Sequence, residues 1–194
     1  LDKDCELNIL TARDEKGLAV LRHTASHVMA EAVQTLFPEA KVAIGPSIDT
    51  GFYYDFECQS FSRDDLDAIE KEMKKIIKKG AKIERFTKSR EDAIAFFKEK
   101  NEPYKVELIE DLPEGEEISF YSQGDWTDLC AGPHLMSAKG VKAFKLLSSS
   151  SAYWRGSEKN AMLTRIYGTA YATKDELKEH LEQMEEAKKR DHNK

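Results

Sequence analysis

Apolar residues recur at helical spacing over Leu18–Leu36, the first periodic segment of the chain. They fall three or four residues apart and Pro38 follows the last of them, so the pattern predicts one amphipathic helix. The apolar positions are Leu21, Ala25, Val28, Met29, Ala32, Val33 and Leu36. His23 and His27 are four residues apart in this helix and are therefore expected on one of its faces.

A hairpin is predicted after this helix, over Ala43–Cys58. Turn signals at Gly45-Pro46 and at Asp49–Gly51 precede an aromatic run that favours a strand. Before the helix, the short apolar run Leu7–Leu10 indicates another strand. The first part of the chain therefore combines one long helix with short strands.

A second helix is indicated by an apolar stripe from Leu66 to Ile77, with Ser62 or Asp64 as its cap and Gly80 near its end. The segments that follow are predicted as mostly strand. We expect a strand at residues 81–88, a helix from 89 to about 100, strands within 106–111, 118–130, 143–154 and 165–173, and a charged helix over 174–189.

The order of these elements predicts the fold class. Helices cluster early, strands cluster late, and no regular alternation of strand and helix repeats along the chain. We therefore expect an α+β fold, with a layer of helices on an antiparallel sheet, in preference to a doubly wound parallel sheet. With 194 residues, the chain is long enough for one substantial core.

Composition supports a folded protein and indicates its cellular compartment. Hydrophobic residues make up 40% and charged residues 34%, as in ordinary globular proteins. No apolar run approaches the roughly 20 residues that span a bilayer, and the first residues do not resemble a signal peptide. The three cysteines, Cys5, Cys58 and Cys130, follow no disulfide pattern. We expect a cytoplasmic protein with reduced thiols and no membrane partner.

The net charge of -6 argues against attraction of nucleic acid to the whole surface. Between Lys71 and Arg90, however, nine Lys and Arg residues stand against two Glu. This segment is either a local basic patch or simply the solvated face of a helix.

Two short motifs bring together residues with metal-binding or catalytic chemistry. HTASH places His23 and His27 one helical turn apart, and DLCAGPH places Cys130 and His134 on a turn next to Asp128. The ligand types suit zinc. HTASH lacks the Glu of H-E-x-x-H, which argues against a metalloprotease. A chain with five histidines can also produce such a pair by chance, but the second motif favours a dedicated pocket.

Six segments, in order, resemble the editing (N2) domain of bacterial-type threonyl-tRNA synthetases: RHTASH, AIGPSIDTGFYYDF, PYKVELI, DLCAGPH, AYWRG and RIYGTAYA. The resemblance implies the α+β editing-domain fold of the threonyl/alanyl type over residues 20–173. It further implies that residues 1–19 end a preceding small domain and that residues 174–194 form a linker helix toward an absent catalytic domain. No class II aminoacylation motif or anticodon-binding domain occurs in the chain, so we expect it to edit tRNA and not to charge it.

The resemblance also implies an activity, namely hydrolysis of serine mischarged onto tRNA(Thr). His23 is expected to act as the general base that orients water. Lys105 is expected to position water or the ester and to offset the developing negative charge. Substrate-binding roles are implied for five further residues, which are His27, Tyr54, Asp128, Cys130 and His134.

Among these five, Asp128 is expected to bind the serine ammonium and Tyr54 to lie beside the terminal adenosine. Cys130 and His134 complete the serine pocket, and His27 steadies its neighbours. The expected partners are the acceptor end of tRNA(Thr) carrying serine and the catalytic and anticodon-binding domains of the parent synthetase. The Lys71–Arg90 segment and Arg155 are candidate phosphate contacts.

The metal content is open from the residues alone. Spacing favours zinc at His23, His27, Cys130 and His134, whereas the resemblance implies a metal-free threonyl site and a zinc site in alanyl relatives. We therefore expect no required cofactor. Two alternatives remain, a zinc-dependent alanyl-type deacylase and a tRNA-docking module without catalysis.

Overall fold

The computed structural model describes residues 15–193, which form an α+β fold of helices on antiparallel sheets. The α-helices are α1 (Glu15–Leu36), α2 (Arg63–Lys79), α3 (Arg90–Glu99), α4 (Pro103–Glu110) and α5 (Lys174–His192). The strands are β1 (Lys41–Val42), β2 (Ser47–Ile48), β3 (Gly51–Glu57), β4 (Ile83–Lys88), β5 (Ile118–Gln123), β6 (Trp126–Leu129), β7 (Ala143–Tyr153) and β8 (Met162–Tyr171). The predicted fold class is confirmed.

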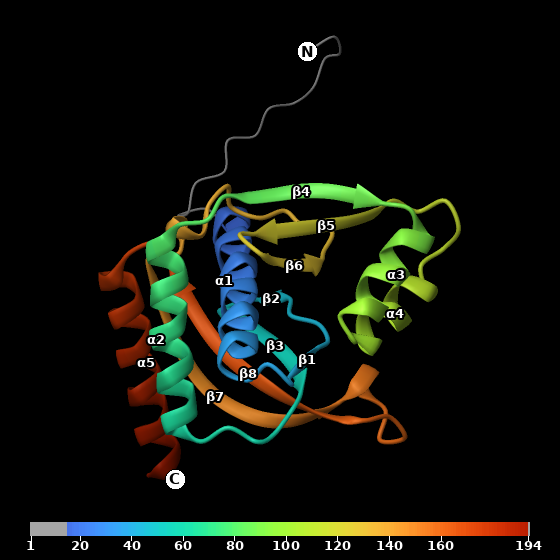
Figure 1. The fold of residues 1–194 in the computed structure, drawn as a ribbon. Helices are drawn as coiled ribbons and strands as arrows, with labels where there is room; N and C mark the ends of the chain where they lie inside the picture. Colours follow the sequence, from blue (N-terminus) through green and yellow to red (C-terminus); the bar gives the residue numbers. More distant parts are fainter. Residues whose placement is uncertain (1–14, 194) are drawn as a thin grey trace.

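The larger sheet has the strand order β1-β3-β8-β7. The short strand β2 also pairs with β3, at the start of β3, whereas β1 pairs with its end. All its pairings are antiparallel, and Figure 1 shows β7 and β8 as two long neighbouring strands that pass below α1. The predicted hairpin corresponds to β2 and β3, which pair Ile48 with Gly51. Because side chains alternate along a strand, Phe52, Tyr54 and Phe56 of β3 share one face, and all three are buried.

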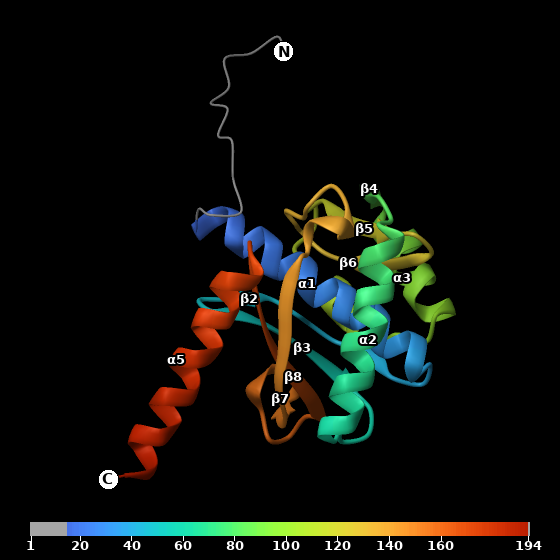
Figure 2. The same ribbon diagram turned by 90° about the vertical axis from the view of Figure 1, so that its left-hand side faces the viewer.

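Helices α1 and α2 cover one face of this sheet (Figures 1 and 2). The apolar stripe predicted for α1 is buried except for Leu36, which is 39% exposed; the other residues pack against the aromatic side chains of β3 and the stripe of α2. Ser62 caps α2 through a reciprocal capping box with Asp65, and Gly80 ends the helix in a left-handed conformation. The main core thus fixes α1 against the sheet.

A smaller sheet, in the order β4-β5-β6, carries its own core. Phe97 of α3, Ile109 of α4 and Phe120 of β5 meet in this second cluster. Ser89 caps α3 as predicted. Figure 1 shows α3 and α4 side by side at the end of this sheet, away from α2 and α5. The second core therefore sets where α4 lies relative to α1.

The prediction of a strand within residues 106–111 is wrong, because residues 106–110 belong to α4 and Asp111 is its C-cap. Pro103 occupies the first turn, where its missing N–H costs no hydrogen bond. Leu108 packs with Tyr104 against Trp154, four residues apart as on one helix face. Ile109 turns to the second core instead. A run of only six residues did not reveal this helical spacing.

The ends of the described region bear on the predicted domain limits. Helix α1 begins at Glu15, so residues 15–19 continue into the histidine-bearing helix. The predicted strand at Leu7–Leu10 and Cys5 lie outside the described residues. The predicted charged helix is α5, none of whose residues is buried, although His180 contacts the ring of Tyr171. No helix among residues 15–193 has the length and apolar character needed to cross a membrane.

Candidate functional site

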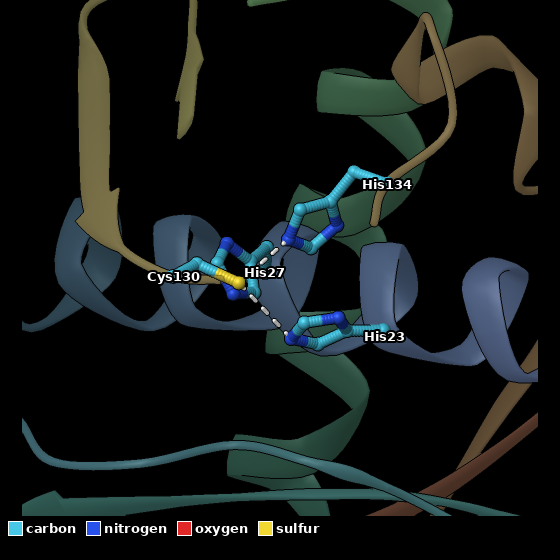
Figure 3. Close-up of side chains that lie close together, drawn as sticks. All are labelled: His23, His27, Cys130 and His134. Carbon is cyan, nitrogen blue, oxygen red and sulfur yellow. Dashed lines mark hydrogen bonds between the residues drawn. The ribbon is translucent and has the colours of Figure 1, made fainter. Parts of the chain in front are cut away.

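Helix α1 presents His23 and His27 from successive turns toward the loop that follows β6 (Figure 3). Their rings meet edge to face, with centroids 5.1 Å apart. His27 is 4% exposed and His23 is half-buried. The i, i+4 spacing therefore places both imidazoles on one face, as predicted.

The loop after β6 brings Cys130 and His134 over that face. Gly132 adopts φ +75, and a side chain there would collide with the ring of Tyr121, so the turn requires glycine. The Gly132 N–H donates to Cys130 Sγ at 3.2 Å. Thr24 Oγ1 lies 3.1 Å from His134 Nδ1 and accepts the Leu135 N–H, which anchors the loop to α1.

Together these residues form a compact group, here termed the histidine–cysteine cluster, made of His23, His27, Cys130 and His134. Cys130 Sγ lies 3.3 Å from His23 Nε2 and 3.2 Å from His134 Nε2 (Figure 3). The four potential ligand atoms all lie within 4.8 Å of one another. The sequence thus correctly predicted that two motifs a hundred residues apart meet.

Beside the cluster lies a buried ion pair. Lys105 Nζ of α4 is 2.8 Å from Asp128 Oδ1 of β6, and the side chains are 3% and 1% exposed. Tyr54 Oη donates to Asp128 Oδ2 at 2.6 Å and accepts from Lys105 Nζ at 3.0 Å. Lys105 is therefore not the solvated surface lysine that its sequence neighbourhood alone would favour.

Asp128 Oδ1 differs from the other polar atoms of this group in its hydrogen bonding. Although it lies close to the Lys105 ammonium, it accepts no well-directed hydrogen bond, and no other buried side-chain oxygen or nitrogen within residues 15–193 shares this state. A carboxylate oxygen has two lone pairs, so Oδ1 can accept a further donor beside the Lys105 ammonium. His27 Nε2 approaches the other oxygen, Oδ2, at 3.6 Å.

A cavity of about 330 Å³ opens onto both groups. This volume lies at the low end for small-molecule pockets. His23 and His27 line it from α1, Lys105 and Leu108 from α4, residues 44–46 from the chain before β2, and residues 128–132 from β6 and its loop. His134 and Tyr54 do not line the cavity, but they contact residues that do: His134 contacts Cys130, and Tyr54 contacts Lys105.

Burial keeps the cluster neutral. It lowers the pKa of His23, of His27 strongly, and of His134 to about 2, and the neighbouring imidazoles and Lys105 add to this effect at His27. It also raises the pKa of the Cys130 thiol to about 12. At neutral pH the metal-free cluster is therefore three neutral imidazoles and one thiol, with bases available beside the cavity.

The same residues fit a zinc ion as donors. Three histidines and a cysteine match the usual ligand types, and the two sulfur–nitrogen separations, 3.3 and 3.2 Å, are compatible with tetrahedral coordination. Thr24 holds the second ring nitrogen of His134, as outer-shell groups do at metal sites. The donor types and spacing of the cluster therefore suit a metal ion.

The structure describes the surroundings of two residues that were expected to contact the tRNA. Tyr54 is fully buried in the core, so only its hydroxyl reaches the site and its ring is not available to stack beside an adenosine. Arg155 forms ion pairs with Glu107 and Asp111 of the α4 region, which leaves it a poor candidate for phosphate.

The sequence patterns did not reveal the cavity walls at Gly45, Pro46 and Leu108. The Gly45-Pro46 turn was visible as a signal, but nothing local indicated that it faces the histidines.

Acidification is expected to destabilise the chain through the cluster. The folded state binds fewer protons than the unfolded state, because burial lowers the pKa of His27 and His134 below the ordinary value of about 6.5. Stability is therefore complete above that pH and falls below it, by up to about 1.4 kcal/mol per pH unit for each residue. Urea unfolding at several pH values, with a chelator present, measures this slope.

The matched variants for this measurement are H27N/H134N and H180N. The first is expected to flatten the pH slope because it removes two buried groups, whereas the second, on α5, is expected to keep it. An undiminished slope in H27N/H134N would contradict the assignment of the pH dependence to His27 and His134.

A larger hollow, here termed the lysine groove, lies between α2 and α5 and contains none of the predicted site residues. Its volume is about 1120 Å³, and its floor includes Ile77, Phe144 and Leu181. Its lysines are Lys74, Lys78, Lys139, Lys142, Lys174, Lys178 and Lys189, against Glu182, Glu185 and Glu186. Part of the predicted basic segment therefore faces a groove that is locally positive.

Comparison with known proteins gives a consistent family. Residues 118–167, which include Asp128, Cys130 and His134, match the threonyl and alanyl tRNA synthetase second additional domain. Threonine–tRNA ligases of Acetivibrio thermocellus and Clostridium novyi are each 62% identical to the chain over 195 aligned residues. A threonine–tRNA ligase of Clostridium botulinum is 64% identical over the same length.

Each of these alignments covers 100% of this chain and 31% of the relative, so the chain spans about a third of the length of the ligases it matches. The resemblance predicted from the six motifs is confirmed: over its whole length, this chain corresponds to the part of threonyl-tRNA synthetases that includes the second additional domain.

Proposed function

We propose that this chain hydrolyses seryl-tRNA(Thr), releasing serine and free tRNA, as the proofreading activity of a threonyl-tRNA synthetase. The observation that carries the proposal is the small cavity that His23, Lys105 and Asp128 line together. A base, a cation and an anion at one cavity suit an amino-acid ester, which has a carbonyl to attack and an ammonium to hold.

The need for such a site follows from the chemistry of the two amino acids. Serine lacks one methyl group of threonine, and a missing methyl changes binding by only about 1–3 kcal/mol, or roughly 10–200-fold. A synthesis site alone therefore cannot reject serine strongly enough. A second cavity that admits serine and has no room for the extra methyl supplies the remaining accuracy.

In the proposed mechanism, His23 orients a water molecule and accepts its proton during attack on the ester carbonyl. The low pKa that burial gives its imidazole keeps it unprotonated at neutral pH. The Lys105 ammonium offsets the charge that develops on the carbonyl oxygen. The proton then passes to the ribose oxygen of the tRNA as the ester bond breaks.

The remaining residues hold the substrate and these two groups. Asp128 Oδ1 accepts a hydrogen bond from the serine ammonium while its other oxygen keeps the bond from Tyr54. Cys130 holds His23 at Nε2, and the His134 ring packs against the rings of His23 and His27. Tyr54 acts through its hydroxyl, which orients both Lys105 and Asp128.

The first experiment compares four rates: hydrolysis of seryl-tRNA(Thr) and threonyl-tRNA(Thr), each with and without a strong chelator. Rapid loss of serine, with threonine retained and no effect of the chelator, is expected for metal-free editing. Tight tRNA binding without any hydrolysis would instead favour the docking module.

The zinc-dependent deacylase remains the second candidate because the cluster has suitable donors. When bound at His23, His27, Cys130 and His134, zinc would supply Lewis-acid activation of water. In that case the purified chain contains about one zinc per molecule, and chelation abolishes turnover. The alanine variant of His134, which does not line the cavity, would then lose metal and activity together.

Binding of tRNA is expected to weaken as salt rises, because neutralising phosphates releases counterions. Lys74 and Lys78 of the lysine groove are our candidate phosphate ligands. The K74A/K78A variant is expected to reduce the slope of log K against log salt by about 0.7–0.9 for each phosphate that the protein no longer neutralises. K98A/K159A, which removes two exposed lysines outside the groove, is the charge-matched control. Equal slopes for both variants would exclude the lysine groove as the surface that binds the tRNA phosphates.

A further inference from the structure

Glu102 is a buried carboxylate that lies outside the cavity, at the N-cap of α4. It is 8% exposed and uses both oxygens. Oε2 accepts the Val42 N–H of β1 at 2.9 Å, and Oε1 accepts from Gln34 Nε2 of α1 at 2.8 Å. The residue caps no N–H group of its own helix with its side chain, so its bonds connect α4 to other elements.

The partners of Gln34 fix the orientation of its amide. The indole Nε1 of Trp126 lies 2.7 Å from Gln34 Oε1 and can only donate. The amide nitrogen therefore faces the Glu102 carboxylate and the Ala40 carbonyl, which only accept. Every donor in this chain of hydrogen bonds meets an acceptor in one arrangement alone, which makes it a rigid connection.

The Glu102–Gln34–Trp126 chain of hydrogen bonds joins the elements that carry the proposed reaction. The ring of Trp126 contacts the ring of His27 edge to face at 5.5 Å. Trp126 and Asp128 are two residues apart on β6 and so project from the same face of the strand. The three connected elements are α4 with Lys105, α1 with His23 and His27, and β6 with Asp128.

Helix α4 needs such a connection. It has only 8 residues, and helices this short are marginal unless tertiary contacts hold them. Lys105 is its third residue, so any shift of the helix start moves the Lys105 ammonium relative to Asp128 and Tyr54. A misplacement of about 1 Å in a catalytic group can cost roughly 100-fold in rate.

We propose that Glu102 is a positioning residue for the hydrolysis of the aminoacyl ester: bonded to Val42 and Gln34, it fixes the start of α4 and thereby places Lys105 at the cavity. The role in hydrolysis rests on the proposed function. The placement of Lys105 does not depend on it and can be measured separately.

The test exchanges the two side chains. In E102Q, an amide NH₂ faces either the Gln34 NH₂ or the Val42 N–H, so two donors meet and the connection breaks. In the double variant Q34E/E102Q, the amide at 102 accepts from Val42 and donates to the carboxylate at 34, which still accepts from Trp126. The exchange restores the bond between positions 102 and 34 with its polarity reversed, but it leaves the Ala40 carbonyl without the donor that Gln34 supplies, so the connection is restored only in part.

For seryl-tRNA(Thr), kcat is expected to fall on the order of 10–100-fold in E102Q, with KM changed much less, and to recover in part in Q34E/E102Q, where the bond to the Ala40 carbonyl stays lost. E110Q is the matched control, because Glu110 is exposed at the far end of the same helix. Wild-type kcat in a folded E102Q, or a double variant no faster than E102Q, would overturn the proposal.

The independent readout is acetylation of Lys105 by acetic anhydride, followed by mass spectrometry of its peptide. Lys105 is 2% exposed and is expected to react slowly in the wild type and E110Q, at least several-fold faster in E102Q, and at an intermediate rate in Q34E/E102Q. Equal acetylation in all four proteins would refute the placement. If the wild type hydrolyses no seryl-tRNA(Thr), the proposed function fails while this measurement still decides the placement. If E102Q does not fold, W126F removes the indole donor to Gln34 together with part of the ring that contacts His27, and the acetylation of Lys105 is then the deciding readout.

Discussion

The H23A variant is expected to hydrolyse seryl-tRNA(Thr) about 10²–10⁴-fold more slowly than the wild type. His23 lines the cavity, lies outside the main hydrophobic core, and is held at Nε2 by Cys130 Sγ at 3.3 Å. Its removal therefore takes away the base without opening that core, and the loss is expected in kcat with the free energy of unfolding little changed. Single-turnover rates and urea unfolding measure the two quantities.

The controls for H23A separate a base from a metal ligand. Imidazole added to the solution is expected to restore part of the H23A rate, because truncation enlarges a cavity that already opens to solvent. H134A is expected to lose much less activity, since His134 lies behind the cavity wall. Equal losses in H23A and H134A, without rescue by imidazole, would contradict the base and favour the zinc candidate.

Much of the site was predictable because its main parts are local in sequence. The spacing of His23 and His27 fixes them on one face of any helix that contains both, and the apolar stripe of α1 made that helix evident. The caps Ser62 and Ser89 mark helix starts by their own hydrogen bonds. Gly132 similarly marks the turn that carries the second motif.

The rest depends on contacts that no local pattern encodes. Lys105 becomes a site residue only because α4 packs between two cores, and its helix was mistaken for a strand. Tyr54 alternates onto the buried face of β3, so its hydroxyl reaches the site while its ring packs in the core. Glu102 gave no signal at all, since a single Glu before a Pro is ordinary in a loop.

Replacing Lys105 by methionine is expected to abolish measurable editing and to destabilise the fold. The variant keeps most of the side-chain volume but leaves the Asp128 carboxylate, 1% exposed, without its cation. Removal of one partner of a buried ion pair typically costs about 3–5 kcal/mol. Urea unfolding of K105M, D128N and K105M/D128N measures this cost, and the double variant is expected to be more stable than K105M because it buries no unpaired charge.

The same three variants show whether Lys105 does more than neutralise Asp128. If Lys105 acted only by holding Asp128, its removal from D128N would change nothing further, and K105M/D128N would hydrolyse seryl-tRNA(Thr) as fast as D128N. We expect the double variant to be slower than D128N, because the ammonium also offsets charge on the reacting carbonyl. Equal rates for those two variants would reduce Lys105 to a structural counterion, and the proposed mechanism would then need another group to stabilise the oxyanion.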